Sequence, residues 1–387
     1  MKASYDIVII GGGIHGAACA QAAAAKNYSV LLLEQNKAAG LATSSASSKL
    51  IHGGLRYLES GEFHLVYECL RERRILLRNA PHLVKLEKFF IPIYSHTRRR
   101  PWQIFIGLCI YSLFSGKKFS IIPKKTWPTL DGLHQQNLQA VFQYVDAKTD
   151  DKKLTQAVLA SAVSLGADVL ISASFLSSQF KKGVHQVRYQ TDQIHQIDCQ
   201  LMINCAGPWV NEVLQKIKPA ATPLAIDLVL GTHIVIDAPL VQGMYYLEAP
   251  QDGRAVFVMP WKGKTLMGTT EVLFQKNADE IAPPDEDIKY LLAVYRHYFN
   301  IDLRPNDIVD AFAGCRVLPS DQHSTFKKSR ETIIHQSPEG VLSIYGGKLT
   351  AHRSTAEHVM QQIAAHLPSR DAKADTRDLT LPVISHL

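Results

Sequence analysis

The hydrophobic and polar positions at the start of the chain change from a strand pattern to a helix pattern and back. An apolar run at residues 6–10 leads into a glycine-rich turn, an alanine-rich segment follows, and a second apolar run at 30–33 ends at Glu34. Two short apolar runs joined by a helical segment are typical of a βαβ unit with parallel strands. The pattern therefore predicts such a unit over residues 5–34.

The turn of this unit carries glycines at the spacing that dinucleotide-binding proteins use. Gly11 permits a tight turn, Gly13 lets the backbone approach a pyrophosphate, and Gly16 lets the helix pack closely on the strand. The N-terminus of the helix offers free N–H groups to phosphate, and Glu34 is placed to accept hydrogen bonds from ribose hydroxyls. We therefore expect a bound dinucleotide.

Further along the chain, the patterns predict two kinds of sheet. Helices are expected at 63–79, from about 150, at 285–298 and at about 350–367, and strands at 169–172, 185–189, 199–204 and 341–345. Alternating runs at 229–236, 254–259 and 265–269 indicate an antiparallel meander. We predict an α/β (α+β) protein with a discontinuous, Rossmann-like domain (1–75, 145–222 and 330–387) and an inserted antiparallel-sheet substrate domain (76–144 and 223–329).

Composition narrows the classes of partner. The formal charge of +7 favours anionic ligands or an anionic membrane surface, and no nucleic-acid module is present. The six cysteines form no CxxC pair, so neither a metal site nor a disulfide framework is predicted. We expect a cytoplasmic protein.

The most apolar segment, residues 102–114, lies between Arg98–Arg100 and Lys117–Lys118. It is shorter than the roughly 20 residues that span a bilayer. Two interpretations stay open: a buried helix with solvated charges at its ends, or a helix in the interface of the inner face of the cytoplasmic membrane.

The βαβ unit alone does not separate FAD from NAD. FAD is favoured because the fingerprint is single and N-terminal, and because Gly346, Gly347 and Lys348 precede a helix near the C-terminus. Backbone N–H groups and a lysine there would stabilise the negative charge of a reduced flavin.

The run Thr43-Ser44-Ser45-Ala46-Ser47-Ser48-Lys49-Leu50-Ile51-His52-Gly53-Gly54-Leu55-Arg56-Tyr57-Leu58-Glu59 resembles the aerobic, membrane-associated flavoprotein glycerol-3-phosphate dehydrogenases of the D-amino-acid-oxidase superfamily. Blocks that resemble the same family follow in order at 204–210, 231–235, 258–261, 268–271, 314–316 and 346–350. The resemblance covers nearly all of the chain. The chain differs from the family that it resembles in lacking the family's C-terminal helical domain, and in having Glu271 where the family commonly has Asp.

The resemblance implies non-covalent FAD and oxidation of sn-glycerol 3-phosphate to dihydroxyacetone phosphate by hydride transfer to flavin N5, with electrons passed to quinone or oxygen. The residues that we expect to bind FAD are Gly11, Gly13, Ile14, Gly16, Glu34, Ser44, Ser45, Ser48, Gly207, Gly346, Gly347, Lys348, Leu349 and Thr350.

Oxidation of an alcohol also needs a proton acceptor and a grip on the substrate. His233 is our first candidate for the acceptor and His52 the second, because a neutral imidazole accepts a proton near neutral pH. Lys348 is expected beside the flavin or the developing alkoxide. Candidate substrate-binding residues are Arg56, Arg316, Tyr57 and Thr270, with the arginines on phosphate.

Two alternatives stay open. A carboxylate also pairs with arginine, so the substrate could be another 2-hydroxy acid or an amino acid. The chain could also be a non-catalytic flavin-binding homologue.

Overall fold

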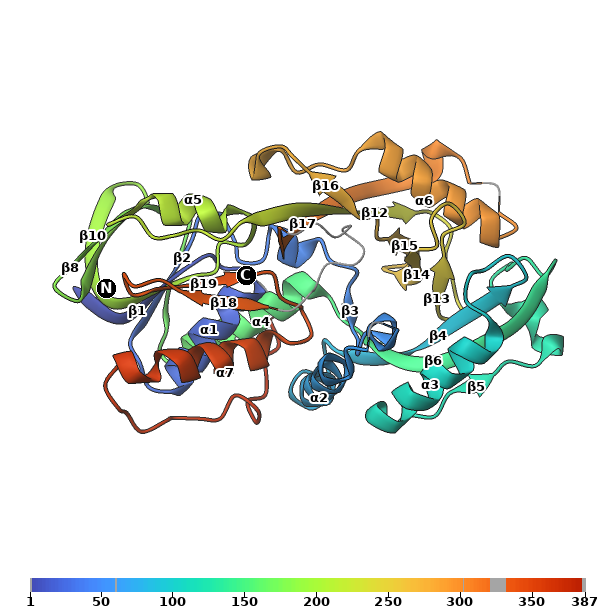
Figure 1. Cartoon of the computed structure of the whole chain (residues 1–387), viewed down its shortest axis with the longest axis horizontal. Helices are drawn as coiled ribbons and strands as arrows, with labels where there is room; N and C mark the ends of the chain where they lie inside the picture. Colours follow the sequence, from blue (N-terminus) through green and yellow to red (C-terminus); the bar gives the residue numbers. More distant parts are fainter. Residues whose placement is uncertain (1, 60, 302, 321–331, 385–387) are drawn as a thin grey trace.

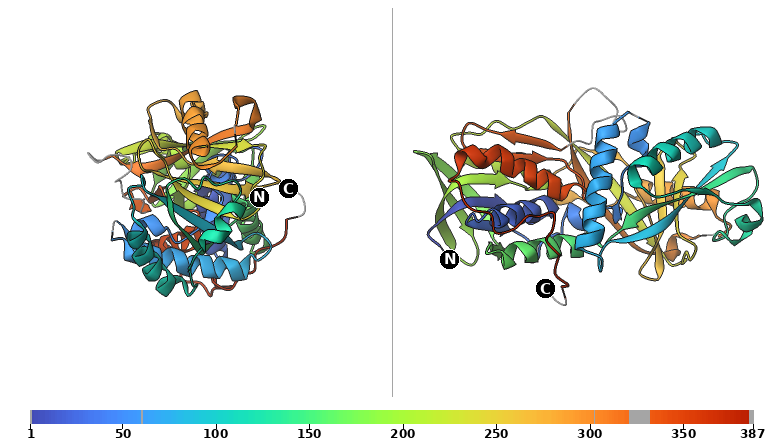
Figure 2. Two further views of the ribbon diagram at one scale, coloured as in Figure 1. Left: turned by 90° about the vertical axis from the view of Figure 1, so that its right-hand side faces the viewer. Right: turned by 90° about the horizontal axis from the view of Figure 1, so that it is seen from below.

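The computed structural model describes residues 2–59, 61–301, 303–320 and 332–384. Two large sheets lie side by side along the long axis of the molecule, with helices at the outer faces of both (Figure 1). The view from below in Figure 2 shows the same two-part arrangement.

The first sheet, sheet A, has nine strands and contains the predicted βαβ unit. Parallel pairing joins β10 to β1, β1 to β2 and β2 to β7, while β8, β9 and the N-terminal part of β10 are antiparallel. Its strands are β1 (Ser4–Ile10), β2 (Val30–Glu34), β7 (Asp168–Ile171), β8 (Ser174–Lys181), β9 (Val184–Gln190), β10 (Ile194–Asn204), β11 (Ile217–Lys218), β18 (Ile333–Gln336) and β19 (Val341–Tyr345).

Helices α1 (Ile14–Ala25), α4 (Asp151–Ser164) and α7 (His352–Ile363) cover one face of sheet A, and α5 (Val210–Gln215) lies on the other (Figure 1). All residues of α1 except His15 are buried, because α4 and α7 both pack against it. Alanine suits a helix enclosed in this way, since its small side chain permits close approach of its neighbours without loss of helix propensity.

The second sheet, sheet B, has ten strands in the order β16-β12-β15-β14-β13-β4-β6-β3, with β17 paired to β12 and β5 to β6. Most of the pairs are antiparallel, and β13 is parallel to β4. Its strands are β3 (Leu50–Ile51), β4 (Lys85–Tyr94), β5 (Ser120–Ile121), β6 (Leu138–Lys148), β12 (Ile226–Ile236), β13 (Met244–Glu248), β14 (Ala255–Trp261), β15 (Lys264–Gly268), β16 (Val272–Phe274) and β17 (Ile308–Pro319).

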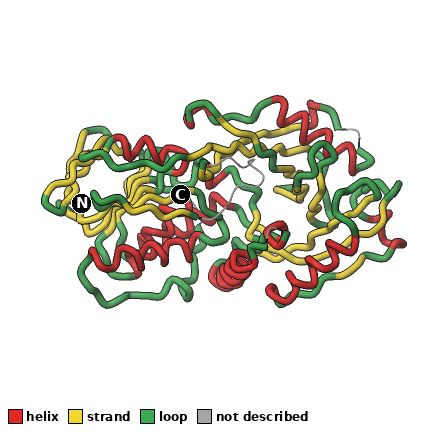
Figure 3. Tube along the Cα trace, viewed as in Figure 1, coloured by secondary structure: helices red, strands yellow, loops and turns green. Residues whose placement is uncertain are grey.

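Three helices accompany sheet B: α2 (Phe63–Asn79), α3 (Pro101–Ser115) and α6 (Asp285–Tyr298). The long pair β12–β17 runs from sheet B to the side of α5, which brings the two sheets into contact above the loop after β2 (Figures 1 and 3). Of the helices in the described residues, none is long and apolar enough to cross a membrane.

The predicted mixed α/β class is confirmed, and α2, α6 and β19 have the predicted bounds. The sequence patterns did not predict β4 and β6, which pair along ten positions. Pro92 stands inside β4, but it lies beyond Phe89 and Phe90, which pair with β13. A proline is tolerated there because its missing N–H faces no second strand.

The domain boundaries stay a prediction. β3 belongs to sheet B although it lies inside the range 1–75, and β6 crosses the boundary at 145. The predicted boundary at 329/330 falls outside the described residues.

Candidate active site

The glycine turn after β1 forms a cradle at the N-terminus of α1. Gly13 is the N-cap residue of α1, and it makes no side-chain capping hydrogen bond. The N–H groups of the first turn are therefore directed to the adjoining space. The Ser44 hydroxyl accepts a hydrogen bond from Ile14 N at 2.9 Å, and it comes from a short helical turn, η1 (Thr43–Ser45). A helix N-terminus arranged in this way is a ready site for a phosphate group.

Gly16 is where α1 meets β1. A Cβ built there would lie 1.9 Å from the carbonyl oxygen of Gly11, which is backbone and cannot turn aside. At Gly11, a Cβ would lie 2.6 Å from the Cys205 carbonyl oxygen. These two glycines therefore set the packing of the fingerprint, as predicted for Gly16.

We expect Gly16→Ala to displace the turn, lower the melting temperature by several degrees and abolish flavin retention, because one close contact of this kind costs about 1–3 kcal/mol or more. Thermal unfolding and the flavin-to-protein absorbance ratio measure both effects. Gly107→Ala is the matched control, since a Cβ at that helical position meets nothing closer than 4.0 Å. A G16A protein with full flavin content would contradict the assignment.

Glu34 closes the other end of the cradle. Its Oε2 accepts from Gly12 N at 2.6 Å and its Oε1 from Asn36 N at 2.7 Å. Oε1 also accepts from Asn36 Nδ2 at 2.8 Å, which fills its two lone pairs, whereas Oε2 retains capacity for a ribose hydroxyl. Glu34 thus fixes the glycine turn as well as facing the nucleotide space.

A cavity of about 360 Å³ runs from this cradle along sheet A. Predicted cofactor residues that line it are Gly11, Gly13, Ile14, Glu34, Ser44, Ser48, Gly207, Gly346, Gly347, Lys348, Leu349 and Thr350. Ser45 does not line it, because its hydroxyl donates to the carbonyls of Leu41 and Ala42.

The loop between β19 and α7 supplies the far wall of this cavity. Lys348 Nζ is buried, has no hydrogen-bond partner in the described residues, and lies 4.3 Å from the centre of the Tyr57 ring. A buried ammonium group without a partner is costly, and an anionic group in the cavity would offset that cost. The glycine cradle and this lysine fit FAD, because its pyrophosphate and the edge of its flavin ring can both accept hydrogen bonds from N–H and ammonium groups.

His15 was missed by the sequence reading, although it lies inside the fingerprint. It lines the same cavity, and its ring lies so close to Gly347 that a Cβ there would be 2.1 Å from Nε2. Burial, with a smaller contribution from His352, lowers the pKa of His15 to about 4. His15 is therefore neutral beside the cofactor space.

A second cavity, of about 110 Å³, adjoins the first. It is lined by Ser48, His52, Gly54, Leu55, Arg56, Tyr57, Tyr144, Tyr246, Arg254, Ala255, Phe257, Thr269, Glu271 and Arg316. Ser48, His52, Tyr57 and Arg316 line both cavities, and they therefore mark the junction.

Three arginines and one carboxylate set the charge of the second cavity. Arg316 Nη1 lies 2.7 Å from Glu271 Oε1, and Arg254 Nη1 donates to the Glu271 carbonyl at 2.6 Å. Burial lowers the pKa of Arg316, and the neighbouring charges of Arg56 and Arg254 act in the same direction. Arg56 and Arg316 were predicted, whereas Arg254 belongs to no motif and was missed.

His233, the first candidate for the proton acceptor, lines neither cavity. It is 1% exposed on β12, its ring stacks on Phe312 at 5.2 Å, and its Nε2 lies 2.9 Å from Ser48 Oγ. Burial lowers its pKa to about 3, helped by the charges of Arg316 and Lys49. His52, the second candidate, lines both cavities.

The lowered pKa values of His15 and His233 predict that the free energy of unfolding depends on pH. The pKa is lowered in the folded state, so the unfolded chain binds more protons below about pH 6.5. Above that pH both histidines make their full contribution to the free energy of unfolding. As the pH falls, each contribution decreases by up to about 1.4 kcal/mol per pH unit, down to about pH 4 for His15 and pH 3 for His233. Urea unfolding at pH 7.5 and pH 5 measures the loss, which should shrink in His15→Asn. Equal stability at both pH values, in the parent, would contradict these protonation states.

Thr270 was predicted to contact substrate, but it lines neither cavity. Its hydroxyl donates to Asp287 on α6 at 2.6 Å and accepts from Thr232 N at 2.9 Å. It therefore joins α6 to sheet B. The neighbouring Thr269 and Glu271 line the second cavity instead.

The nucleotide cradle on sheet A and the cationic cavity on sheet B are the two parts that a flavin-dependent oxidoreductase of an anionic substrate needs. Residues 6–353 match the model of the FAD dependent oxidoreductase family, DAO. The chain therefore belongs to this family, its cofactor is FAD, and the prediction of an FAD-dependent oxidoreductase is confirmed.

Relatives with assigned activities cover most of the chain. The aerobic glycerol-3-phosphate dehydrogenase of Escherichia coli K12 is 36% identical over 93% of this chain and 74% of that protein. The D-erythritol 1-phosphate dehydrogenase of Brucella abortus is 32% identical over 97% of this chain and 77% of that protein. The solved glycerol-3-phosphate dehydrogenase of Bacillus halodurans, complexed with FAD, matches with a TM-score of 0.79 at 28% identity, over 98% of this chain and 68% of that one.

Proposed function

We propose that this protein oxidises sn-glycerol 3-phosphate to dihydroxyacetone phosphate. The observation that carries the proposal is the charge of the second cavity. Three arginines and one glutamate line it, so its lining has an excess of cationic side chains, and Arg254 among them is also paired with Asp252 at 3.3 Å. A phosphomonoester dianion matches that excess, whereas the carboxylate of a 2-hydroxy acid or amino acid carries one negative charge.

The junction of the two cavities supports one orientation of the substrate. With its phosphate on the arginines of the second cavity, a three-carbon alcohol would direct its carbinol group to the junction lined by Ser48, His52 and Tyr57. Bound FAD supplies a two-electron oxidant that accepts the carbinol hydride. The protein's part is to hold the anion, to orient the carbon and to take the hydroxyl proton.

A substrate panel tests this proposal against its alternatives. Turnover with an artificial electron acceptor is expected to be highest with sn-glycerol 3-phosphate, with lower rates for D-erythritol 1-phosphate and negligible rates for glycerol, D-lactate and D-alanine. The four-carbon phosphate is included because a relative with that activity is 32% identical. A preference for either carboxylate would show that the arginines hold a carboxylate.

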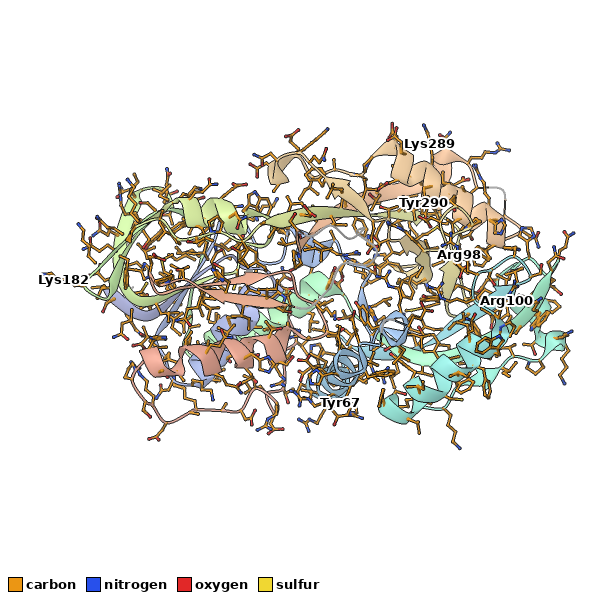
Figure 4. The ribbon with its side chains drawn as sticks, viewed as in Figure 1. Tyr67, Arg98, Arg100, Lys182, Lys289 and Tyr290 are labelled. Carbon is orange, nitrogen blue, oxygen red and sulfur yellow. The ribbon has the colours of Figure 1, made fainter. Side chains whose placement is uncertain are left out.

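We propose further that the electrons pass to a quinone and that α3 contacts a membrane surface. The exposed fractions of Trp102, Ile106 and Leu113 are 63%, 50% and 81%, and Tyr67 of α2 adds another exposed ring. Arg98 and Arg100, before α3, are exposed, and Figure 4 places Tyr67 at the outer edge of the molecule beside α2. Apolar side chains between basic ones support an interfacial helix.

Flotation with vesicles containing anionic lipid measures this contact. Leu113→Asp is expected to release the protein. Val241→Asp, at a site that is 78% exposed elsewhere, is expected to leave it bound. Flotation of L113D equal to that of the parent would remove α3 from the proposal.

A further inference from the structure

His233 has no direct route to the substrate space. One face of its ring lies on Phe312, and a Cβ on Gly268 would be 2.2 Å from its Cδ2, so β15 closes another side. Its Nδ1 is buried and has no partner in the described residues. The contact that leads from His233 to the cavities is the hydrogen bond with the Ser48 hydroxyl, at 2.9 Å.

Ser48 lies at the other end of this contact, at the junction. It lines both cavities, at the place where a carbinol group would meet the cofactor. A hydroxyl group has one donor and two acceptor positions. When Ser48 donates to His233 Nε2, it retains an acceptor position that can face the substrate.

We propose that Ser48 contacts the reacting hydroxyl group and passes its proton to His233. Ser48 is then a catalytic residue, and His233 is a positioning residue that acts through it. The inference rests on the proposed function, which it deepens by assigning the path of the proton.

The step balances in atoms and electrons. The substrate O–H bond breaks as its proton joins Ser48 Oγ, and the Ser48 O–H proton moves to the lone pair of His233 Nε2. The carbinol hydrogen leaves with both bonding electrons to FAD, the oxidant of the proposed function, so that the alcohol becomes a ketone. After product leaves, the proton returns through Ser48 to solvent, and both residues regain their starting state.

The charges around His233 favour this sequence of events. Lys49 is buried and paired with Asp151 of α4 at 2.6 Å, and Arg316 is paired with Glu271 at 2.7 Å. Burial, helped by these two cations, keeps the imidazole neutral and able to accept a proton in the free enzyme. A substrate dianion at Arg316 offsets positive charge and raises the proton affinity of His233 only when substrate is present.

The first test is the tautomer of His233, which does not depend on activity. In the full chain labelled with ¹⁵N-histidine, NMR at pH 7 is expected to show His233 as the neutral Nδ1–H tautomer, assigned by comparison with His233→Asn. The Nε2–H tautomer would overturn the proposal, because that nitrogen would then donate to Ser48 and could not accept.

The second test is anaerobic reduction of the FAD-loaded protein by sn-glycerol 3-phosphate in a stopped-flow instrument. Ser48→Ala is expected to slow reduction about 10²–10³-fold, in the range of general base catalysis. The dissociation constant of the substrate should change less than threefold. Ser48→Thr should recover at least a tenth of the parent rate, and Ser164→Ala, at the end of α4, is the matched control.

A double variant separates a relay from two independent effects. S48A/H233N is expected to be no slower than S48A, because residues that act as a unit are not additive. Multiplied losses, or an S48A rate within threefold of the parent, would overturn the proposal. If the parent itself is bleached by dithionite but not by sn-glycerol 3-phosphate, the proposed function fails instead.

Discussion

Arg316→Ala is expected to raise the apparent KM for sn-glycerol 3-phosphate by roughly 10²–10³-fold and to lower kcat much less. Arg316 lines the junction as well as the second cavity, and its guanidinium pairs with Glu271. Removing one partner of a partly buried charge pair that also holds an anion costs about 3–4 kcal/mol. The loss falls on KM if the residue binds substrate and transition state alike.

Steady-state kinetics with an artificial acceptor measures this split. Arg316→Lys should restore only part of the affinity, because an ammonium group cannot bind two phosphate oxygens in the way that the guanidinium does. Arg188→Ala, on the exposed side of β9, is the matched control for loss of one positive charge. An unchanged KM in R316A would remove Arg316 from the substrate site.

Lys348→Met is expected to have opposite effects on stability and on chemistry. In the protein without FAD, Lys348 Nζ is buried without a hydrogen-bond partner in the described residues. Its cation–π contact with Tyr57, at 4.3 Å, contributes about 1–2 kcal/mol and does not repay the desolvation of an ammonium group. The apoprotein should therefore become about 1–3 kcal/mol more stable in K348M.

The same change should slow flavin reduction about 10²–10³-fold, because the positive charge that stabilises the developing anion is gone. Urea unfolding of the deflavinated protein and stopped-flow reduction of the loaded protein measure the two effects. A destabilised K348M apoprotein with an unchanged reduction rate would show that Lys348 serves the fold, and the present interpretation would be wrong.

The sequence was most informative where local pattern and chemistry coincide. The glycine spacing, the apolar strand before it and Glu34 after it predict a cradle, and the structure has the same residues in contact with one another. Helix α4 begins close to the predicted start at about 150, where Asp150 is the N-cap and accepts a hydrogen bond from Lys153 N. These features depend on neighbours close in the chain.

The sequence was least informative where distant segments decide a residue's environment. Thr270 and Thr269 are adjacent, yet Thr269 lines the second cavity while Thr270 bonds to Asp287. His233 stands behind Ser48 because β12, β15 and a loop more than 180 residues away come together there. Arg254 belongs to no sequence motif, and its place in the lining of the second cavity depends on how the strands of sheet B pair.

The most direct test of the central claim is anaerobic mixing of the purified protein with sn-glycerol 3-phosphate, followed by flavin absorbance. The account predicts a yellow protein whose flavin band is bleached by this compound, while the same concentration of glycerol leaves the band unchanged. A protein that takes up no FAD, or one bleached only by dithionite, would contradict it.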